Sequence, residues 1–297
     1  MKKAELLYKC NNKLGEGITF SKKDQNLFWL DIDNITKLYK FNLITEKKDY
    51  FEIPEIVTAT SIKSKDELVL ISNKGVNIFN IKNKKYSRIL NIEDKIEHTR
   101  SNDGACDAMG RIWFGTMQNN FDEKGNDIPI NDHIGKLYKV DNNKKITIVE
   151  SGLGIPNTFI WSPDNTKFYF TDTLDGNILK YEYELQEGKI SNKQNFAKFD
   201  RGFPDGSTID TDGCIWNCRY GGSCVVRFDP NGNVDQVFEM PVKNITNCIF
   251  GGNDMRTLFI TTASNNGNDQ HELDGSVFAL NLNYEGLEDH QSKIEIQ

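Results

Sequence analysis

The sequence predicts an all-β protein, a six-bladed β-propeller whose ring is closed by pairing of N- and C-terminal strands. Three observations predict this fold: a polar residue that recurs every 42 to 55 residues, an apolar hairpin after most of its copies, and a further apolar strand that ends each repeat. Repeats of this length are typical of propeller blades. Because they cover nearly all of the 297 residues, we expect one domain, 1–297, rather than two.

The recurring polar position comes first in each repeat. Its six copies are separated by 42, 44, 55, 48 and 42 residues: Glu16, Thr58, Asn102, Asn157, Asp205 and Asn247. Periods of about 40 to 50 residues are those of propeller blades. Residues at one position of every blade converge on the axis of a closed ring, so we expect these side chains to meet there.

A hairpin of two apolar strands follows most copies of the polar residue. In the first repeat, Ile18 and Phe20 alternate with other residues, a polar turn occupies 23–26, and an aromatic strand follows at 27–31. Similar turns occur at 65–67, 109–110, 164–165, 211–213 and 253–254. We expect the aromatic strands, for example 28–30 and 168–170, in the core.

A third strand ends each repeat, and its own sixfold recurrence supports the blade count. Its copies begin at Thr36, Gly75, Gly135, Gly176, Gly222 and Gly275. The last copy lies beyond residue 274, and the chain starts with the apolar run 6–8, so the N-terminal segment is expected to supply the outer strand of the final blade. The polar insertions 119–132 and 184–194 are expected to form loops that wall a site.

Composition limits the partners. The 36 basic and 43 acidic residues give a formal net charge of −7 without a basic patch interleaved with aromatic residues, which argues against nucleic acid. No apolar run approaches the roughly 18 residues of a membrane span, and no signal-peptide pattern is present, so no membrane is expected and the location is predicted as cytoplasmic. The six cysteines lack a Cys-x-x-Cys pair and the four histidines lack a zinc motif, which predicts buried free thiols and isolated imidazoles.

The axial residues carry the predicted chemistry. Two carboxylates and an amide oxygen, from Glu16, Asp205 and Asn157, would form a hard metal site without sulfur ligands. Such ligands suit Ca²⁺, Mg²⁺, Mn²⁺, Fe²⁺ or Zn²⁺, and three of them leave room for water and substrate. Asn102 lies in the segment 100–104, which by itself would be an ordinary Asn-Asp-Gly turn. Its place in the repeat, with Arg100 beside it, favours a role at the site.

Seven phrases occur in an order that resembles one known family. They are Leu14-Gly-Glu16-Gly, Arg100-Ser-Asn102-Asp103-Gly, Gly110-Arg-Ile-Trp-Phe-Gly115-Thr-Met117, Gly154-Ile-Pro156-Asn157, Trp161-Ser-Pro-Asp164, Tyr169-Phe-Thr-Asp172-Thr and Pro204-Asp205-Gly206. From about Leu14 to Phe278 the chain resembles the gluconolactonase/regucalcin (senescence marker protein, luciferin-regenerating enzyme) family of sugar lactonases. The resemblance implies a six-bladed propeller with one divalent metal ion on its axis.

The resemblance also implies residue roles. It makes Glu16, Asn157 and Asp205 the metal ligands, and it makes Asp205 the candidate general base.

Arg100 and Asn102 would contact the substrate, and Asn102 could also touch the metal. After Met117 the chain reads Gln118-Asn119-Asn120, where some animal members carry acidic residues that meet the sugar. This departure leaves the identity of the sugar open, although Asn120 is still able to hydrogen-bond a sugar hydroxyl.

These assignments predict metal-dependent hydrolysis of a sugar lactone to its aldonic acid, as part of carbohydrate metabolism. The metal would polarise the lactone carbonyl while Asp205 takes a proton from water, with a metal-activated hydroxide as the alternative. Two other functions stay open: another metal-dependent esterase or phosphotriesterase on the same scaffold, and a non-enzymatic metal-binding propeller. Arg100 favours an enzyme, because a structural ion needs no arginine beside it. Pentono- and hexonolactones are both compatible with these residues.

Overall fold

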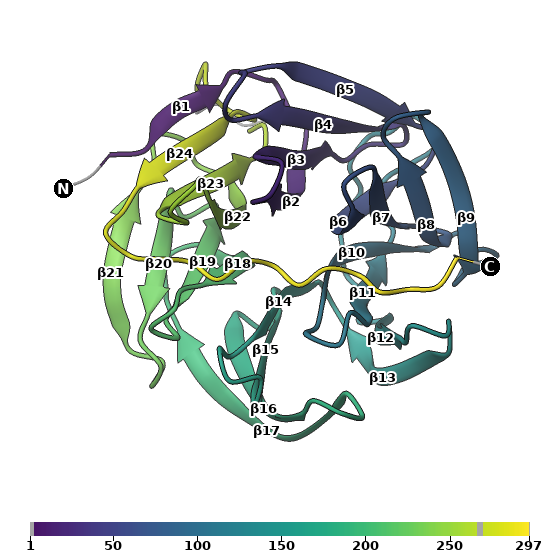
Figure 1. Cartoon of the computed structure of the whole chain (residues 1–297). Helices are drawn as coiled ribbons and strands as arrows, with labels where there is room; N and C mark the ends of the chain where they lie inside the picture. The colour runs from purple at the N-terminus through teal and green to yellow at the C-terminus, as the bar shows by residue number, and fades with distance from the viewer. Residues whose placement is uncertain (1–2, 266–269, 297) are drawn as a thin grey trace.

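A computed structural model describes residues 3–265 and 270–296. In these residues, six antiparallel sheets of four strands stand around one axis (Figure 1), which confirms the predicted six-bladed propeller. The strands are β1 (Glu5–Tyr8), β2 (Gly15–Ser21), β3 (Asn26–Asp31), β4 (Thr36–Asn42), β5 (Lys48–Ile53), β6 (Val57–Ser64), β7 (Glu67–Ser72), β8 (Gly75–Asn80), β9 (Lys85–Asn91), β10 (Thr99–Cys106), β11 (Ile112–Gln118), β12 (Gly135–Val140), β13 (Ile146–Leu153), β14 (Pro156–Trp161), β15 (Lys167–Asp172), β16 (Asn177–Glu184), β17 (Lys189–Lys198), β18 (Phe203–Ile209), β19 (Ile215–Tyr220), β20 (Cys224–Phe228), β21 (Val234–Glu239), β22 (Ile245–Gly251), β23 (Thr257–Thr262) and β24 (Val277–Asn281). None of the described residues belongs to a helix long and apolar enough to cross a membrane.

The ring closes as the sequence predicts. Blades 1 to 5 are the sheets β2–β5, β6–β9, β10–β13, β14–β17 and β18–β21, and each follows chain order from the axis outwards. Blade 6 has the order β22-β23-β24-β1, and β1 pairs antiparallel with β24 so that Leu6 lies opposite Phe278. The first and last strands of the chain therefore share one sheet, which leaves no gap in the ring.

The expectation of three strands per repeat is wrong for blades 1 to 5, because a fourth, outer strand completes each of them. These outer strands, for example β13 and β21, are largely exposed or half-buried and so lack the apolar pattern of the inner strands. The insertion 184–194, expected as a loop, instead contains the turn between β16 and β17 and the first residues of β17. A solvated strand with polar side chains is hard to distinguish from a loop by its pattern.

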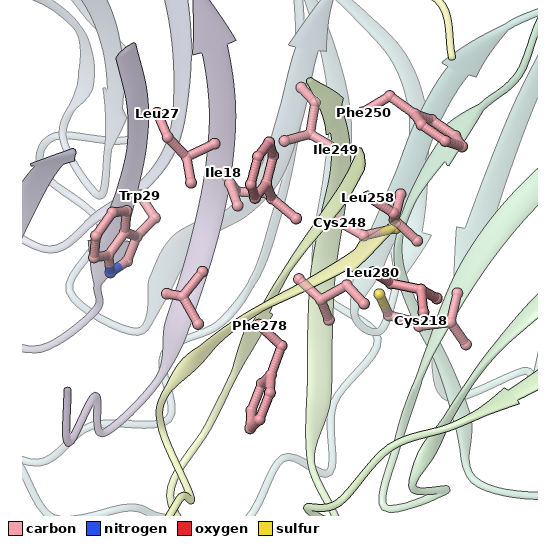
Figure 2. Close-up of a cluster of buried hydrophobic side chains, with 14 of the residues drawn as sticks. Ile18, Leu27, Trp29, Cys218, Cys248, Ile249, Phe250, Leu258, Phe278 and Leu280 are labelled. Carbon is pink, nitrogen blue, oxygen red and sulfur yellow. The ribbon is translucent and has the colours of Figure 1, made fainter. Parts of the chain in front are cut away.

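The core lies between the blades, where each sheet buries both faces against its neighbours. The second strand of each blade reads as a continuous apolar run for this reason, and Trp29, Trp113 and Trp216 on three such strands are fully buried. Figure 2 shows the cluster around the closing blade, where Phe278 and Cys248 of blade 6 pack with residues of blades 1 and 5. Burial of each such large apolar side chain contributes about 1.5 to 3 kcal/mol. All six cysteines are free and buried, as predicted.

The C-terminal tail crosses the ring after β24, a feature without a signal in the repeat pattern (Figure 1). Backbone N–H groups of Leu287, Ser292 and Lys293 donate to carbonyl oxygens of blades 5, 2 and 3 at 3.1, 2.8 and 3.1 Å. A Cβ on Gly110 would lie 2.7 Å from Cβ of Lys293, so this close approach requires glycine. The tail therefore covers one end of the axial channel, and the other end is left for a site.

Candidate metal and substrate site

Every inner strand carries a β-bulge near its recurring polar residue. The register shifts fall between Glu16 and Thr19, Val57 and Ala59, Ser101 and Gly104, Asn157 and Ile160, Pro204 and Ser207, and Ile245 and Cys248. A bulge leaves residues unpaired and redirects their side chains, and bulges are frequent beside active sites. The axial residues thus lie where the ladder is locally interrupted.

The bulges correct the idea that the recurring residues occupy one structural position. Glu16 and Asn157 are paired, with Leu30 and Thr171, just before their bulges. Asn102, Asp205 and Asn247 lie inside theirs. Relative to the bulge, the recurring residues therefore differ in position by one or two residues between blades.

Hydrogen bonds between neighbouring blades and one electrostatic effect nevertheless link the axial side chains. Asn247 Nδ2 donates to Glu16 Oε2 at 3.1 Å, which joins blades 6 and 1. Asn102 Nδ2 donates to Asn157 Oδ1 at 3.3 Å, which joins blades 3 and 4. The charge of Glu16 in turn raises the pKa of Asp205 in blade 5. Five of the six blades thus contribute side chains to one axial group.

Three carboxylates are buried in this group with few donors. Glu16, Asp103 and Asp205 are 8, 7 and 7% exposed. Burial raises the pKa of Glu16 to about 8, with a further contribution from the charge of Asp103. Burial, followed by the charges of Glu16 and Asp103, raises the pKa of Asp205 well above its ordinary value. Burial also raises the pKa of Asp103 to about 7. Arg100 favours the charged form of Glu16 and Arg219 that of Asp205, but only as the smallest contributions. The axis is therefore a place where three buried carboxylates outnumber the nearby positive charges.

The donor set fits a hard divalent cation. Glu16 and Asp205 offer carboxylate oxygens and Asn157 offers an amide oxygen, the ligand types that such cations prefer. Thr173 fixes the amide, because Asn157 Nδ2 donates to Thr173 Oγ1 at 2.8 Å while that hydroxyl donates to the Pro204 carbonyl at 2.8 Å. The amide nitrogen is thus held by blade 4, and the amide oxygen is left facing Asn102 and the axis.

The three predicted substrate-binding residues form one hydrogen-bonded group. The buried Arg100 donates through Nε to Asn120 Oδ1 at 2.7 Å and through Nη1 to Asn102 Oδ1 at 3.0 Å. Its guanidinium carbon lies 5.4 Å from the centroid of the Phe121 ring. Burial lowers the pKa of Arg100 to about 10, which leaves it charged at neutral pH. The structure therefore places a cationic donor beside the axial carboxylates.

Two cavities lie along the axial region. One of 300 Å³ is lined by Asn120, Phe121 and Asp127 of the insertion between β11 and β12, together with Lys13 and Tyr220. The insertion 119–132 therefore walls a cavity. That this cavity is a substrate site stays a prediction.

The other cavity, of 210 Å³, lies on the side of the C-terminal tail. It is lined by Asp103 and Asn247 and by tail residues such as Asp289. The axial group therefore lies between a cavity walled by the insertion and a cavity walled by the tail.

The sequence interpretation missed several residues of this region. Asp103 belongs to a quoted phrase but received no role, and the bulge in β10 is the reason that it reaches the axial carboxylates. Lys13 and Tyr220 lie outside the repeated phrases and reach the cavity through ring closure. The sequence does contain a signal for Asp127, because this residue lies in an insertion with many polar residues.

A further group of possible ligands lies apart from the axial residues. Ligand atoms of His133, Asp172 and Asp175 lie within 4.8 Å of one another, although no sequence motif joins these residues. Asp172 already accepts hydrogen bonds from the backbone N–H groups of Gly154 and Ile155 at 2.6 and 2.8 Å. Its carboxylate therefore stabilises the turn before β14, and His133 and Asp175 are exposed.

Comparisons with known proteins identify the family and agree with the fold. The family model described as SMP-30/Gluconolactonase/LRE-like region matches residues 14–264. The chain is 29% identical over 296 residues to a pentonolactonase of Haloferax volcanii, with 96% of each chain covered. It is 29% identical over 281 residues to a 6-deoxy-6-sulfogluconolactonase of Pseudomonas putida, with 92% of each covered. The crystal structure of a calcium-binding protein, regucalcin, of Agrobacterium tumefaciens superposes with a TM-score of 0.88 at 26% identity and covers 98% of this chain and 97% of its own.

Proposed function

The chain belongs to the SMP-30/gluconolactonase/LRE-like family, and we infer that this sugar lactone hydrolase holds one divalent cation with Glu16, Asn157 and Asp205. The observation that carries the proposal is the group of buried carboxylates on the axis beside a hydrogen-bonded arginine, between the cavity walled by the insertion and the cavity walled by the tail. The reaction is the opening of an aldonolactone to its aldonic acid.

A cation explains why the axial carboxylates are buried together. Carboxylates that approach one another in a dry site repel, and burial without a partner costs each of them free energy. A dication balances Glu16 and Asp205 and accepts the oxygen of Asn157 as a neutral ligand. Oxygen ligands of this kind suit Ca²⁺, Mg²⁺, Mn²⁺, Fe²⁺ or Zn²⁺.

The bound cation would supply electrophilic polarisation of the lactone carbonyl and stabilise the negative charge that develops on its oxygen. Arg100 donates hydrogen bonds to substrate oxygens, Asn102 contacts the substrate beside it, and Asn120 keeps the guanidinium in place by accepting from Nε. These donors fix the lactone ring over the axial carboxylates, which lowers the entropic part of the barrier.

Asp205 is the proposed general base. Thr158 Oγ1 and Asn217 Nδ2 donate to its backbone carbonyl at 2.8 and 3.1 Å, so the main chain is fixed and the carboxylate faces Glu16 and Asp103. Water attacks the carbonyl carbon as Asp205 removes its proton. The ring C–O bond then breaks, and the proton returned from Asp205 converts the leaving alkoxide to a hydroxyl.

The test is a panel of pentono- and hexonolactones assayed with chelator-treated protein and with each dication restored. We expect hydrolysis to depend on the dication, and we expect Asp205→Ala to reduce kcat/KM on the order of 10³-fold or more. Paraoxon-like esters run in parallel test the phosphotriesterase alternative. Full activity of Asp205→Ala, or hydrolysis that a chelator leaves intact, would contradict the assignment. Circular dichroism of the variant shows whether any loss reflects unfolding.

A further inference from the structure

The insertion between β11 and β12 folds over the substrate cavity towards blade 1. Phe121 and Asp127 form an isolated antiparallel bridge within it, and the N–H of Ile128 donates to the Asn120 carbonyl at 2.8 Å. Asn34 Nδ2 in blade 1 donates to the Asp122 carbonyl at 3.4 Å. The insertion is thus a short hairpin, anchored at its far end, that forms one wall of the 300 Å³ cavity.

Lys13 fastens this hairpin to the start of blade 1. Its Nζ donates to the Gly125 carbonyl and lies 3.5 Å from Asp33 Oδ1 and 3.8 Å from Asp127 Oδ1. The same ammonium lies 4.6 Å from the centroid of the Phe121 ring. The single positive charge of Lys13 therefore pairs with two carboxylates, and Lys13, Asp33 and Asp127 together carry a net charge of −1.

Asp127, rather than Asp33, is the carboxylate of this group that lies on the 300 Å³ cavity. It lines the cavity beside Asn120 and Tyr220, and its side chain is 54% exposed. Its charge is near enough to raise the pKa of Tyr220, after the larger effect of burial, and to favour the charged form of Arg100. A substrate above the axial carboxylates would therefore meet Asp127 on its outer side.

A carboxylate in this position distinguishes hydroxyls from anionic groups. A sugar hydroxyl can donate to it a hydrogen bond strengthened by the charge. A sulfonate or phosphate cannot donate and is repelled, and Lys13, the lysine among the described residues that line the cavity, is already paired twice. We propose that Asp127 is a specificity-determining residue that makes the pocket selective for neutral lactones over lactones with an anionic substituent at the end distal to the carbonyl.

This inference rests on the lactone hydrolysis proposed above and names the substrate class of the same pocket. It bears on the two relatives named above, because a pentonolactone is neutral whereas a 6-deoxy-6-sulfogluconolactone carries a sulfonate. The net negative charge of Lys13, Asp33 and Asp127 in this chain favours neutral lactones.

Two substitutions separate charge from anchoring. Asp127→Asn and Lys13→Gln each break the contact between the hairpin and blade 1, but they change the pocket charge in opposite directions. Asp132→Asn on the same insertion is the matched control, because its backbone N–H, rather than its carboxylate, donates to Gln118. Asp127→Glu restores the charge.

The measurement is the ratio of kcat/KM for glucono-1,5-lactone to that for 6-deoxy-6-sulfoglucono-1,5-lactone at low and high salt. We expect wild type to prefer the neutral lactone, Asp127→Asn to reduce the ratio about tenfold through KM, and Lys13→Gln to increase it. Asp132→Asn and Asp127→Glu should keep the wild-type ratio, and salt should shrink all the differences.

Three results would overturn the inference. Wild type could prefer the sulfonated lactone, or Asp127→Asn and Lys13→Gln could shift the ratio in the same direction. Asp127→Asn could also slow both substrates equally, which would make Asp127 a structural anchor. In these cases lactone hydrolysis itself still stands. A wild-type protein that hydrolyses neither lactone would overturn the proposed function and this inference together.

Discussion

Two kinds of buried carboxylate occur in this propeller, and they differ in how their charge is balanced. Asp107 and Asp210, at the ends of β10 and β18, are fully buried. Asp107 accepts from Arg111 Nε at 2.6 Å and from Trp113 Nε1 at 2.9 Å. Asp210 likewise accepts from the guanidinium of an arginine and from the indole N–H of a tryptophan. Glu16 is nearly as buried, yet in the described residues its carboxylate accepts from Gly17 N–H and an asparagine amide.

The comparison teaches how to recognise a binding site among buried charges. A carboxylate that pairs with an arginine and accepts from an indole N–H has its charge and its hydrogen bonds satisfied within the protein. An axial carboxylate with neutral donors keeps an unbalanced charge, which a folded protein tolerates where a ligand completes it. The predictions below test this distinction.

The largest effect is expected for Glu16→Gln. The substitution removes a ligand charge, so activity should fall on the order of 10³-fold. Stability without dication should stay equal or rise, because a buried unbalanced carboxylate has been neutralised. Activity assays and urea unfolding of chelator-treated protein measure both. A large loss of stability would place Glu16 in the same structural class as Asp107.

The opposite pattern is expected for Asp107→Asn. It leaves the guanidinium of Arg111 buried without its counterion, which should cost about 3 to 5 kcal/mol of unfolding free energy. Dication affinity per folded molecule should not change, because Asp107 is not part of the axial group. Urea unfolding and calorimetric titration test this pair of results, and weakened dication binding would break the comparison.

The pH dependence of chelator-treated protein should reflect the raised pKa of Glu16. Its ordinary value is 4.5 and its folded value is about 8, so between these values the folded state holds a proton that the unfolded chain has lost. The stabilising contribution is complete below pH 4.5 and is lost as the pH rises through about 8. Melting temperatures should therefore fall across this range without dication. Saturating dication should oppose the fall, by about 2.7 kcal/mol at a hundredfold excess over Kd, and Glu16→Gln should reduce it, leaving the part due to Asp103 and Asp205.

The smallest effect is expected for Thr173→Val, which acts through another residue. Loss of the hydroxyl frees the amide of Asn157, so dication affinity should fall about tenfold while the ligand atoms stay the same. Titration of the dication into this variant and into Thr45→Val, an exposed turn control, measures the effect. Equal affinities would show that the axial amide is oriented without Thr173.

Much of the fold could be predicted because each blade is one local unit repeated along the chain. Hairpins such as β2–β3 have alternating apolar residues and a polar turn within some 15 residues, which a sequence displays directly. The outer strands of blades 1 to 5 could not be predicted, because strands such as β13 are half-solvated and their partners set their limits. The tail could not be predicted either, since Ser292 and Lys293 bond to blades far away in sequence.

The sequence by itself determined the blade count, the closure of the ring and the ligand types that gather at the axis, because repetition and residue chemistry are local properties. Tertiary structure decided the rest. Bulges of unpaired residues brought Asp103 beside Glu16 and Asp205, although strict repeat counting does not align them. Ring closure brought Lys13 to Asp127, since residues distant in the chain become neighbours only when the first blade meets the hairpin of the third. Which charges face the substrate is therefore a property of the closed ring.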